Sequence, residues 1–292
     1  MCKKLLMLLM LFVSLTFVSS ASAANMYWIG YDTNWLDATN WGGTGACPTY
    51  NDWVDIRRDS WVANFPVITT GQTALAGTIR INPGYGGART AKITVDGGDL
   101  NVAQSIYVGW DTTNGADLIL NSGSITTGIG GTNNFTMVGS NGGYGELHVN
   151  GGTLNTGVLG VPKWWETPGA GNVYIDGGLI STVGWLDPDV EDWYHGLVLG
   201  ATGTVEFTKN LADDGGKIRY VADLSEADWD AWQTQLNGWV SSGQIFSSAG
   251  EIQVDYSSAG DTRTTEIYSV IPEPMTVALL GIGGLLLRRR RK

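Results

Sequence analysis

A short motif that recurs four times in the middle of the chain limits the possible folds more than any other feature. The copies read ITVDGGDL from Ile93, LILNSGSI from Leu118, LHVNGGTL from Leu147 and VYIDGGLI from Val173. Successive copies begin about 25 to 30 residues apart, a period typical of architectures built from stacked repeats. A second signal, an apolar residue followed by glycine, comes later in each unit, at Val108-Gly109, Val138-Gly139, Leu159-Gly160 and Leu199-Gly200.

Each copy alternates apolar and variable residues before it reaches an Asp or Asn and a glycine. Alternation with a period of two predicts strands with one buried face. The buried pairs would be Ile93/Val95, Leu118/Leu120, Leu147/Val149 and Val173/Ile175, while Thr94, Ile119, His148 and Tyr174 face outward. Glycine tolerates the positive φ of a tight corner, so each copy predicts a strand followed by a turn.

Repeats with the same turn chemistry in the same phase favour a right-handed parallel β-helix of about four to five coils, an all-β fold in which each coil covers the next. Asp96, Asn121, Asn150 and Asp176 would then stack above one another. We assign the repeats to residues 91–210, with TVEFTKN from Thr204 as a degraded fifth coil. The alternative is an antiparallel β-sandwich, whose strands also alternate.

The open ends of such a column need caps, because unpaired strand edges aggregate. Residues 24–90 would form an N-terminal β cap, with Asn34-Trp35, Asn40-Trp41 and predicted strands at 53–56 and 78–81. Residues 211–270 would form the other cap. It contains a short helix at 226–237, with Ser225 as N-cap and Gly238 as its stop, and a β-hairpin made from EIQVDY and TTEIYSV.

The charge balance excludes some partners. The net charge is −11, and five of the 17 cations lie together at residues 288–292, so the body is more acidic than the whole chain. Such a body repels nucleic acid and anionic lipid. We therefore expect no nucleic-acid partner.

The first residues have the form of a secretory signal peptide. Lys3 and Lys4 precede an apolar run, and Ala21-Ser22-Ala23 supplies an A-x-A cleavage site, so residues 1–23 would be removed on export. Cleavage would leave Cys47 as the only cysteine and exclude an internal disulfide.

The C-terminal segment, residues 271–292, has three ordered parts. Pro272, Glu273 and Pro274 precede an apolar stretch at 275–287, which precedes the cations Arg288, Arg289, Arg290, Arg291 and Lys292. As a helix the stretch would cover about 20 Å of a hydrocarbon core of about 30 Å, so it predicts a weak transmembrane anchor with its cations on the cytoplasmic side.

These three parts resemble the PEP-CTERM sorting signal. The resemblance implies recognition by an exosortase, a membrane protease-transpeptidase that removes the tail, in bacteria that make exopolysaccharide or biofilm matrix. It therefore implies a protein that crosses the inner membrane, is transiently anchored there, and ends at the cell surface or outside the cell. The body resembles autotransporter-like β-helix repeat regions, which implies no particular activity.

Two insertions interrupt the repeat and carry aromatic residues. Candidate contacts to an extracellular polysaccharide are Trp110, Trp164, Trp165, Trp185 and Trp193; the alternative is that these indoles pack on the coil wall. An acidic loop at 187–192 fails the EF-hand pattern, which leaves open an irregular calcium site.

The chain contains no recognisable catalytic motif. We therefore expect a non-catalytic surface or matrix protein with no catalytic residues, metal site or cofactor. A polysaccharide-binding adhesin is the first alternative. A β-helix polysaccharide lyase using Lys163 is the second, and only the fold analogy supports it.

Overall fold

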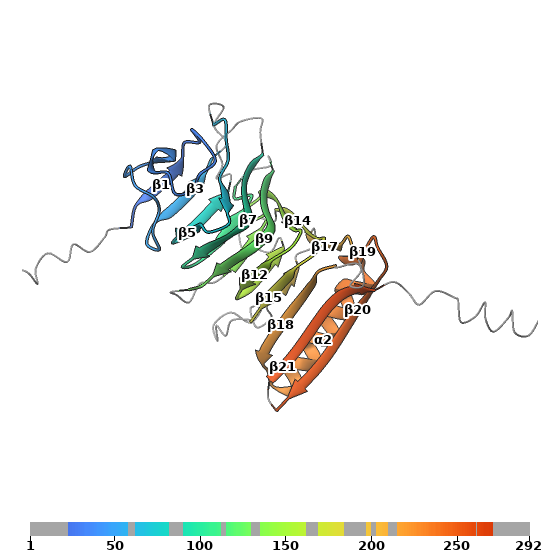
Figure 1. Ribbon diagram of the computed structural model, residues 1–292. Coiled ribbons are helices and arrows are strands. Elements are labelled where there is room, and N and C mark those ends of the chain that lie inside the picture. Colours follow the sequence, from blue (N-terminus) through green and yellow to red (C-terminus); the bar gives the residue numbers. More distant parts are fainter. Residues whose placement is uncertain are drawn as a thin grey trace, which may run out of the picture.

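The computed structural model describes residues 23–57, 62–81, 90–111, 115–129, 135–161, 169–183, 197–199, 203–209, 215–260 and 262–270. The described chain is mostly β-strand and forms a parallel β-solenoid of about five turns, with one α-helix. Figure 1 shows the coils following one another along the molecule, from the blue N-terminal end to the orange and red C-terminal end.

The secondary-structure elements follow the chain in a regular order. They are β1 (Asn25–Trp28), η1 (Ala38–Asn40), β2 (Trp41–Gly42), β3 (Trp53–Ile56), β4 (Val67–Thr69), β5 (Thr73–Ala76), β6 (Thr78–Ile81), β7 (Ala91–Val102), β8 (Ile106–Val108), β9 (Ala116–Thr127), β10 (Phe135–Val138), β11 (Tyr144–Val149), β12 (Thr153–Thr156), β13 (Val158–Val161), β14 (Ala170–Ile175), β15 (Leu179–Thr182), β16 (Leu197–Leu199), β17 (Gly203–Phe207), β18 (Lys217–Asp223), α2 (Glu226–Ser241), β19 (Ile245–Ser247), β20 (Glu251–Ala259) and β21 (Thr262–Val270).

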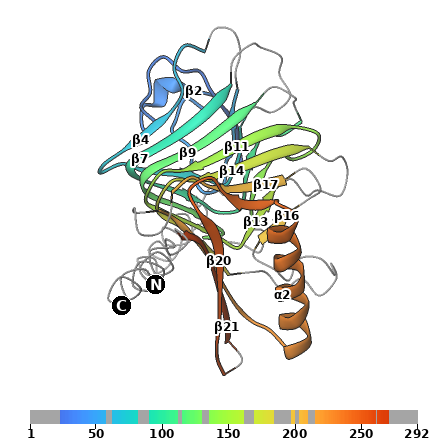
Figure 2. The same ribbon diagram turned by 90° about the vertical axis from the view of Figure 1, so that its right-hand side faces the viewer.

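Two sheets form the walls of the solenoid within the described residues. One has eight strands in the order β16-β13-β10-β8-β6-β3-β1-β2, and the other has 13 strands and wraps around the remaining two faces. Strands β7 and β9 each run through a corner, so one long strand serves both faces of the second sheet. In Figure 2 the strands β7, β9, β11, β14 and β17 lie one beside the next along a single face.

The predicted inward rows are confirmed. Pairing in register joins Ile93 to Leu118, Leu118 to Leu147 and Leu147 to Val173, and the row two residues further along is Val95, Leu120, Val149 and Ile175. All eight side chains are fully buried. The degraded coil from Thr204 is also confirmed, because Val205 and Phe207 continue both rows and are buried.

The glycine corners have positive φ, as their sequence predicts. Gly123, Gly152 and Gly178 have φ of 85°, 72° and 73°. They stack so closely that a Cβ added to Gly152 would lie 2.5 Å from the carbonyl oxygen of Gly123, and one added to Gly178 would lie 2.5 Å from that of Gly152. The left-handed position is the second residue after the Asn or Asp in these coils, which is why Ser122 replaces the first glycine without strain.

The predicted Asp/Asn stack forms only in part. Asn150 Nδ2 donates to Asn121 Oδ1 over 2.9 Å, as a stack requires. Asp96 instead pairs in register with Ser122, because the ladder between β7 and β9 shifts after Val95. In that first copy the positive φ falls on Gly97, one position earlier than in the later coils. The bulge moves Asp96 out of line with Asn121.

The second glycine signal marks a corner in two of its four places and lies within a strand in a third. Gly109 and Gly139 turn corners with φ of 77° and 76°. Gly160 lies inside β13, where pairing places it beside Met137, so Val161 and not Leu159 is the equivalent of Val138. A Cβ at residue 160 would meet the flexible side chain of Met137, which would have to move to admit it. Gly200 lies outside the described residues.

At the N-terminal end, an aromatic cluster lies over the first coils. Trp28, Trp35 and Trp41 are buried, and Trp41 meets each of the other two rings edge to face, at centroid distances of 4.9 and 4.7 Å. The predicted strands 53–56 and 78–81 are confirmed as β3 and β6. Coiling begins before residue 91, since β4 and β5 already pair in parallel with β7, and β6 with β8.

At the C-terminal end, the second sheet continues into the antiparallel hairpin β20–β21, and α2 packs beside it (Figures 1 and 2). The side chain of Ser225 caps the helix by accepting from Asp228 N, as predicted. The predicted stop at Gly238 is wrong: the helix runs to Ser241, because Trp239 is buried against Trp232 on the same helix face. Gly243, with φ of 76°, follows the helix end.

Several predictions concern residues outside the described ranges. These are the signal peptide through residue 22 and the tail 271–292 with its predicted transmembrane segment 275–287. Among the residues that the structure describes, neither helix has the length and apolar character required to span a bilayer.

The stacked corners give a direct test of coil spacing. Gly260→Ala adds a Cβ at φ of 65° in open space and should cost about 1 kcal/mol of backbone strain. Gly152→Ala adds the same strain plus the collision with Gly123 O, so we expect it to cost at least about 2 kcal/mol more. Urea denaturation of the two variants measures the difference, and equal losses would contradict the close stacking.

Candidate functional site

The outward faces of β7, β9, β11, β14 and β17 carry two parallel rows of side chains. The polar ladder consists of Lys92, Asp117, Glu146, Asn172 and Thr204, which are paired in register from coil to coil. The histidine ladder, two residues further along each strand, consists of Thr94, Ile119, His148, Tyr174 and Glu206. Consecutive strands lie about 4.8 Å apart, so each rung contacts the next.

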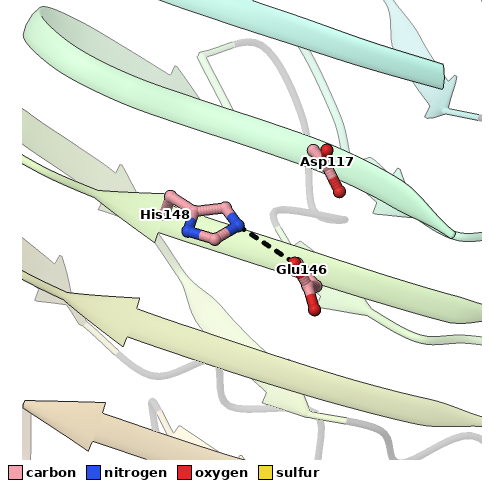
Figure 3. Close-up of side chains that lie close together, drawn as sticks. All are labelled: Asp117, Glu146 and His148. Carbon is pink, nitrogen blue, oxygen red and sulfur yellow. Dashed lines mark hydrogen bonds and ion pairs between the residues drawn. The ribbon is translucent and has the colours of Figure 1, made fainter. Parts of the chain in front are cut away.

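Three titratable side chains meet where these ladders cross the second and third coils, at β9 and β11. Asp117 lies on β9, and Glu146 and His148 lie two residues apart on β11 (Figure 3). One ligand atom from each of the three lies within 4.8 Å of the others. His148 Nε2 is 3.1 Å from Glu146 Oε2, and both side chains are about one quarter exposed, at 29% and 23%. The group is therefore open to small solutes.

A chain of hydrogen bonds fixes the Glu146 carboxylate from the following coils. Thr204 Oγ1 donates to Asn172 Oδ1 over 2.8 Å, and Asn172 Nδ2 donates to the Tyr144 hydroxyl oxygen over 3.1 Å. The Tyr144 hydroxyl then donates to Glu146 Oε1. Every donor in the chain points toward Glu146, so its Oε1 is occupied and its Oε2 is directed to His148.

The His148 ring is held by aromatic stacking. Tyr174, the next rung of the histidine ladder, stacks on it with a centroid distance of 4.9 Å and an angle of 16° between the planes. The Tyr144 hydroxyl, which holds Glu146, stays protonated at neutral pH. Burial, the hydrogen bond to Glu146 and the negative charge of Glu146 raise the pKa of Tyr144 to about 12. The imidazole and the carboxylate are both oriented before any ligand arrives.

Asp117 has the least favourable surroundings of the three. It is directly opposite Glu146 in the ladder, and like charges in that position repel. Its carboxylate accepts no hydrogen bond from the described residues. Burial, followed by the charge of Glu146, raises the pKa of Asp117, while His148 and Lys92 act in the opposite sense. A bound cation would remove this repulsion.

The donor set offers one imidazole nitrogen and two carboxylates, a mixture that suits divalent transition metals better than calcium, which prefers oxygen alone. The arrangement can therefore bind a cation or an uncharged polar ligand.

Of the candidate glycan contacts, the structure describes Trp110 alone. Its indole is half-buried and meets the Tyr107 ring edge to face at 4.7 Å. Trp164, Trp165, Trp185 and Trp193 lie outside the described residues, as do Lys163 and the acidic loop 187–192.

Sequence reasoning did not single out Asp117 and Glu146, although it placed His148 correctly on the outer face. The signal that could have found them is in the repeat itself. Each carboxylate lies two residues before the outward residue of its copy, so aligning the copies places Asp117 beside Glu146.

Asp117→Asn should stabilise the metal-free protein. Removing one of two opposed charges should raise the free energy of unfolding at pH 7 in chelator by a few tenths to about 1 kcal/mol. Because the pKa of Asp117 is raised on folding, the gain is fully present above that raised pKa and is lost as the pH falls through it. Urea denaturation at several pH values measures this.

Asp99→Asn is the matched control for this prediction. Asp99 is exposed and accepts a hydrogen bond from Ser124 Oγ over 2.6 Å, so its replacement should bring no gain. A loss of stability in Asp117→Asn at pH 7 would contradict the proposed repulsion.

Comparisons with protein-family models, with curated proteins and with solved structures found no match to this chain. The function must therefore be argued from its own residues and geometry.

Proposed function

We propose that this protein is an exported, non-catalytic component of the cell surface or extracellular matrix, sorted by an exosortase-type protease through its C-terminal tail. The observation that carries the proposal is the order of Pro272, Glu273 and Pro274, the apolar stretch 275–287 and the cations Arg288 to Lys292. The signal-peptide pattern of residues 1–23 supplies the matching route across the inner membrane.

The form of the body supports a matrix role. The last strand that the structure describes, β21, ends at Val270, directly before the segment 271–292 that carries the sorting motif. The coils bury their apolar rows without a disulfide, since Cys47 is a free thiol. We also propose a right-handed coil, the sense that parallel crossover connections take in about 98% of cases.

The sorting proposal predicts a change of location. Pro272→Ala combined with Glu273→Ala should leave full-length protein in the inner membrane, because the protease no longer recognises the tail while the apolar stretch still anchors it. Fractionation and immunoblotting in a host that carries the protease measure this. The matched control is Pro66→Ala, which changes a proline outside the tail and should be processed normally. Unchanged processing of the double variant would contradict the proposal.

A second candidate function is polysaccharide binding through aromatic side chains. The half-buried Trp110 ring rests against Tyr107, and an indole that is held in place but still accessible suits stacking on a sugar ring. This candidate adds an extracellular ligand to the matrix role and leaves the sorting route unchanged.

Binding of this kind predicts retardation of the protein in gels that contain its glycan. Trp110→Ala should abolish or weaken the retardation, whereas Trp53→Ala, which removes an exposed indole from β3, should not. Affinity electrophoresis against a panel of acidic and neutral polysaccharides measures the effect. If no glycan retards the wild-type protein, this candidate fails and the sorting proposal stands.

A further inference from the structure

The outer face carries one group of side chains that neither export nor matrix structure requires. Asp117, Glu146 and His148 project from two neighbouring coils toward a common point (Figure 3). Every other coil has neutral residues or a lone charge at these rungs, as at Asn172 and Thr204. Two adjacent carboxylates beside a histidine therefore need an explanation other than the stability of the coils.

We infer that Asp117, Glu146 and His148 bind a divalent transition-metal ion of the zinc class on the outer face of the solenoid. The inference does not depend on the sorting route or on glycan binding, because it uses only residues of β9 and β11.

The distances fit this class of ion. Bonds of about 2.0 to 2.1 Å to a tetrahedral zinc ion place two ligand atoms about 3.3 Å apart. His148 Nε2 and Glu146 Oε2 are already 3.1 Å apart. All three ligand atoms lie within 4.8 Å, so Asp117 must move its carboxylate by only about 1.5 Å, which rotation of its partly exposed side chain allows. Three protein ligands leave a fourth position open to water or to an external ligand.

The surroundings act as a supporting shell for such an ion. Metal-binding carboxylates and imidazoles are normally oriented by further contacts, whose loss costs about 10- to 100-fold in affinity. Here the chain from Thr204 through Asn172 and Tyr144 holds Oε1 of Glu146. The Tyr174 ring holds the plane of His148. A group that served only to fill the surface would not need both.

The charge balance also favours a cation. Asp117 and Glu146 are opposed in register, and a divalent ion between them converts their repulsion into two attractions. Because the ion would join β9 to β11, binding it should also stabilise the contact between the two coils that contain these strands.

The test is a titration of the full chain, without an added histidine tag, with ZnCl2 against a chromophoric chelator. We expect one saturable site. Asp117→Asn and His148→Gln should each weaken binding at least tenfold, and Asn172→Ala by about tenfold as a residue that positions Glu146. CaCl2 should compete poorly, since calcium prefers an all-oxygen site.

Two controls separate this site from others. Asp99→Asn changes a carboxylate on the neighbouring strand β7, outside the site, and should leave the affinity unchanged. His195→Gln removes the second histidine of the mature chain and should also leave it unchanged. Thermal unfolding provides a second measurement: zinc should raise the midpoint of the wild type but not of Asp117→Asn, which we expect to be the more stable of the two without metal.

The inference is overturned if the wild type shows no saturable binding up to millimolar zinc. It is equally overturned if Asp117→Asn and His148→Gln bind zinc as tightly as the wild type, because the ion would then lie elsewhere.

Discussion

Backbone hydrogen bonding between parallel coils fixes their spacing at about 4.8 Å, and the rest of the structure depends on that distance. Inside the column, it brings the buried rows that include Val95, Leu120, Val149 and Ile175 into continuous contact. At the corners it leaves no room for a side chain, which is why Gly152 and Gly178 stack directly on the carbonyl groups of the coil before them. Burial of the apolar rows stabilises the column, and the glycine corners allow the coils to stack at this spacing.

The same spacing acts on the outer face, where it brings together side chains that are distant in sequence. Asp117 and Glu146 become neighbours only because their strands pair in register. Their repulsion works against stability, while the hydrogen-bond chain to Tyr144 and the stacked Tyr174 ring hold the group in place. Side chains that lower the stability of the fold but are held in a fixed orientation are typical of functional sites.

The two ends of the column would expose strand edges and apolar interior, which the repeats themselves cannot cover. Three tryptophan rings are buried at the N-terminal end. At the C-terminal end, Trp232 of α2 packs against Tyr220, and its indole N–H donates to Thr265 Oγ1. The hairpin then presents β20 as the edge strand, with Glu251 and Asp255 exposed along it. Charged side chains on an edge discourage pairing with another chain, which suits a protein proposed to work at high local concentration in a matrix.

The sequence by itself determined the inward rows, the glycine corners, the N-cap at Ser225 and the hairpin, because each follows from local periodicity or local backbone chemistry. It failed at Gly238, the predicted helix stop, because burial of Trp239 carries the helix past that residue. Only the tertiary structure decided which rungs pair, because insertions of different length separate the copies and the bulge after Val95 shifts the register. The group of Asp117, Glu146 and His148 depends on that pairing, so it could not be identified from any one segment of the chain.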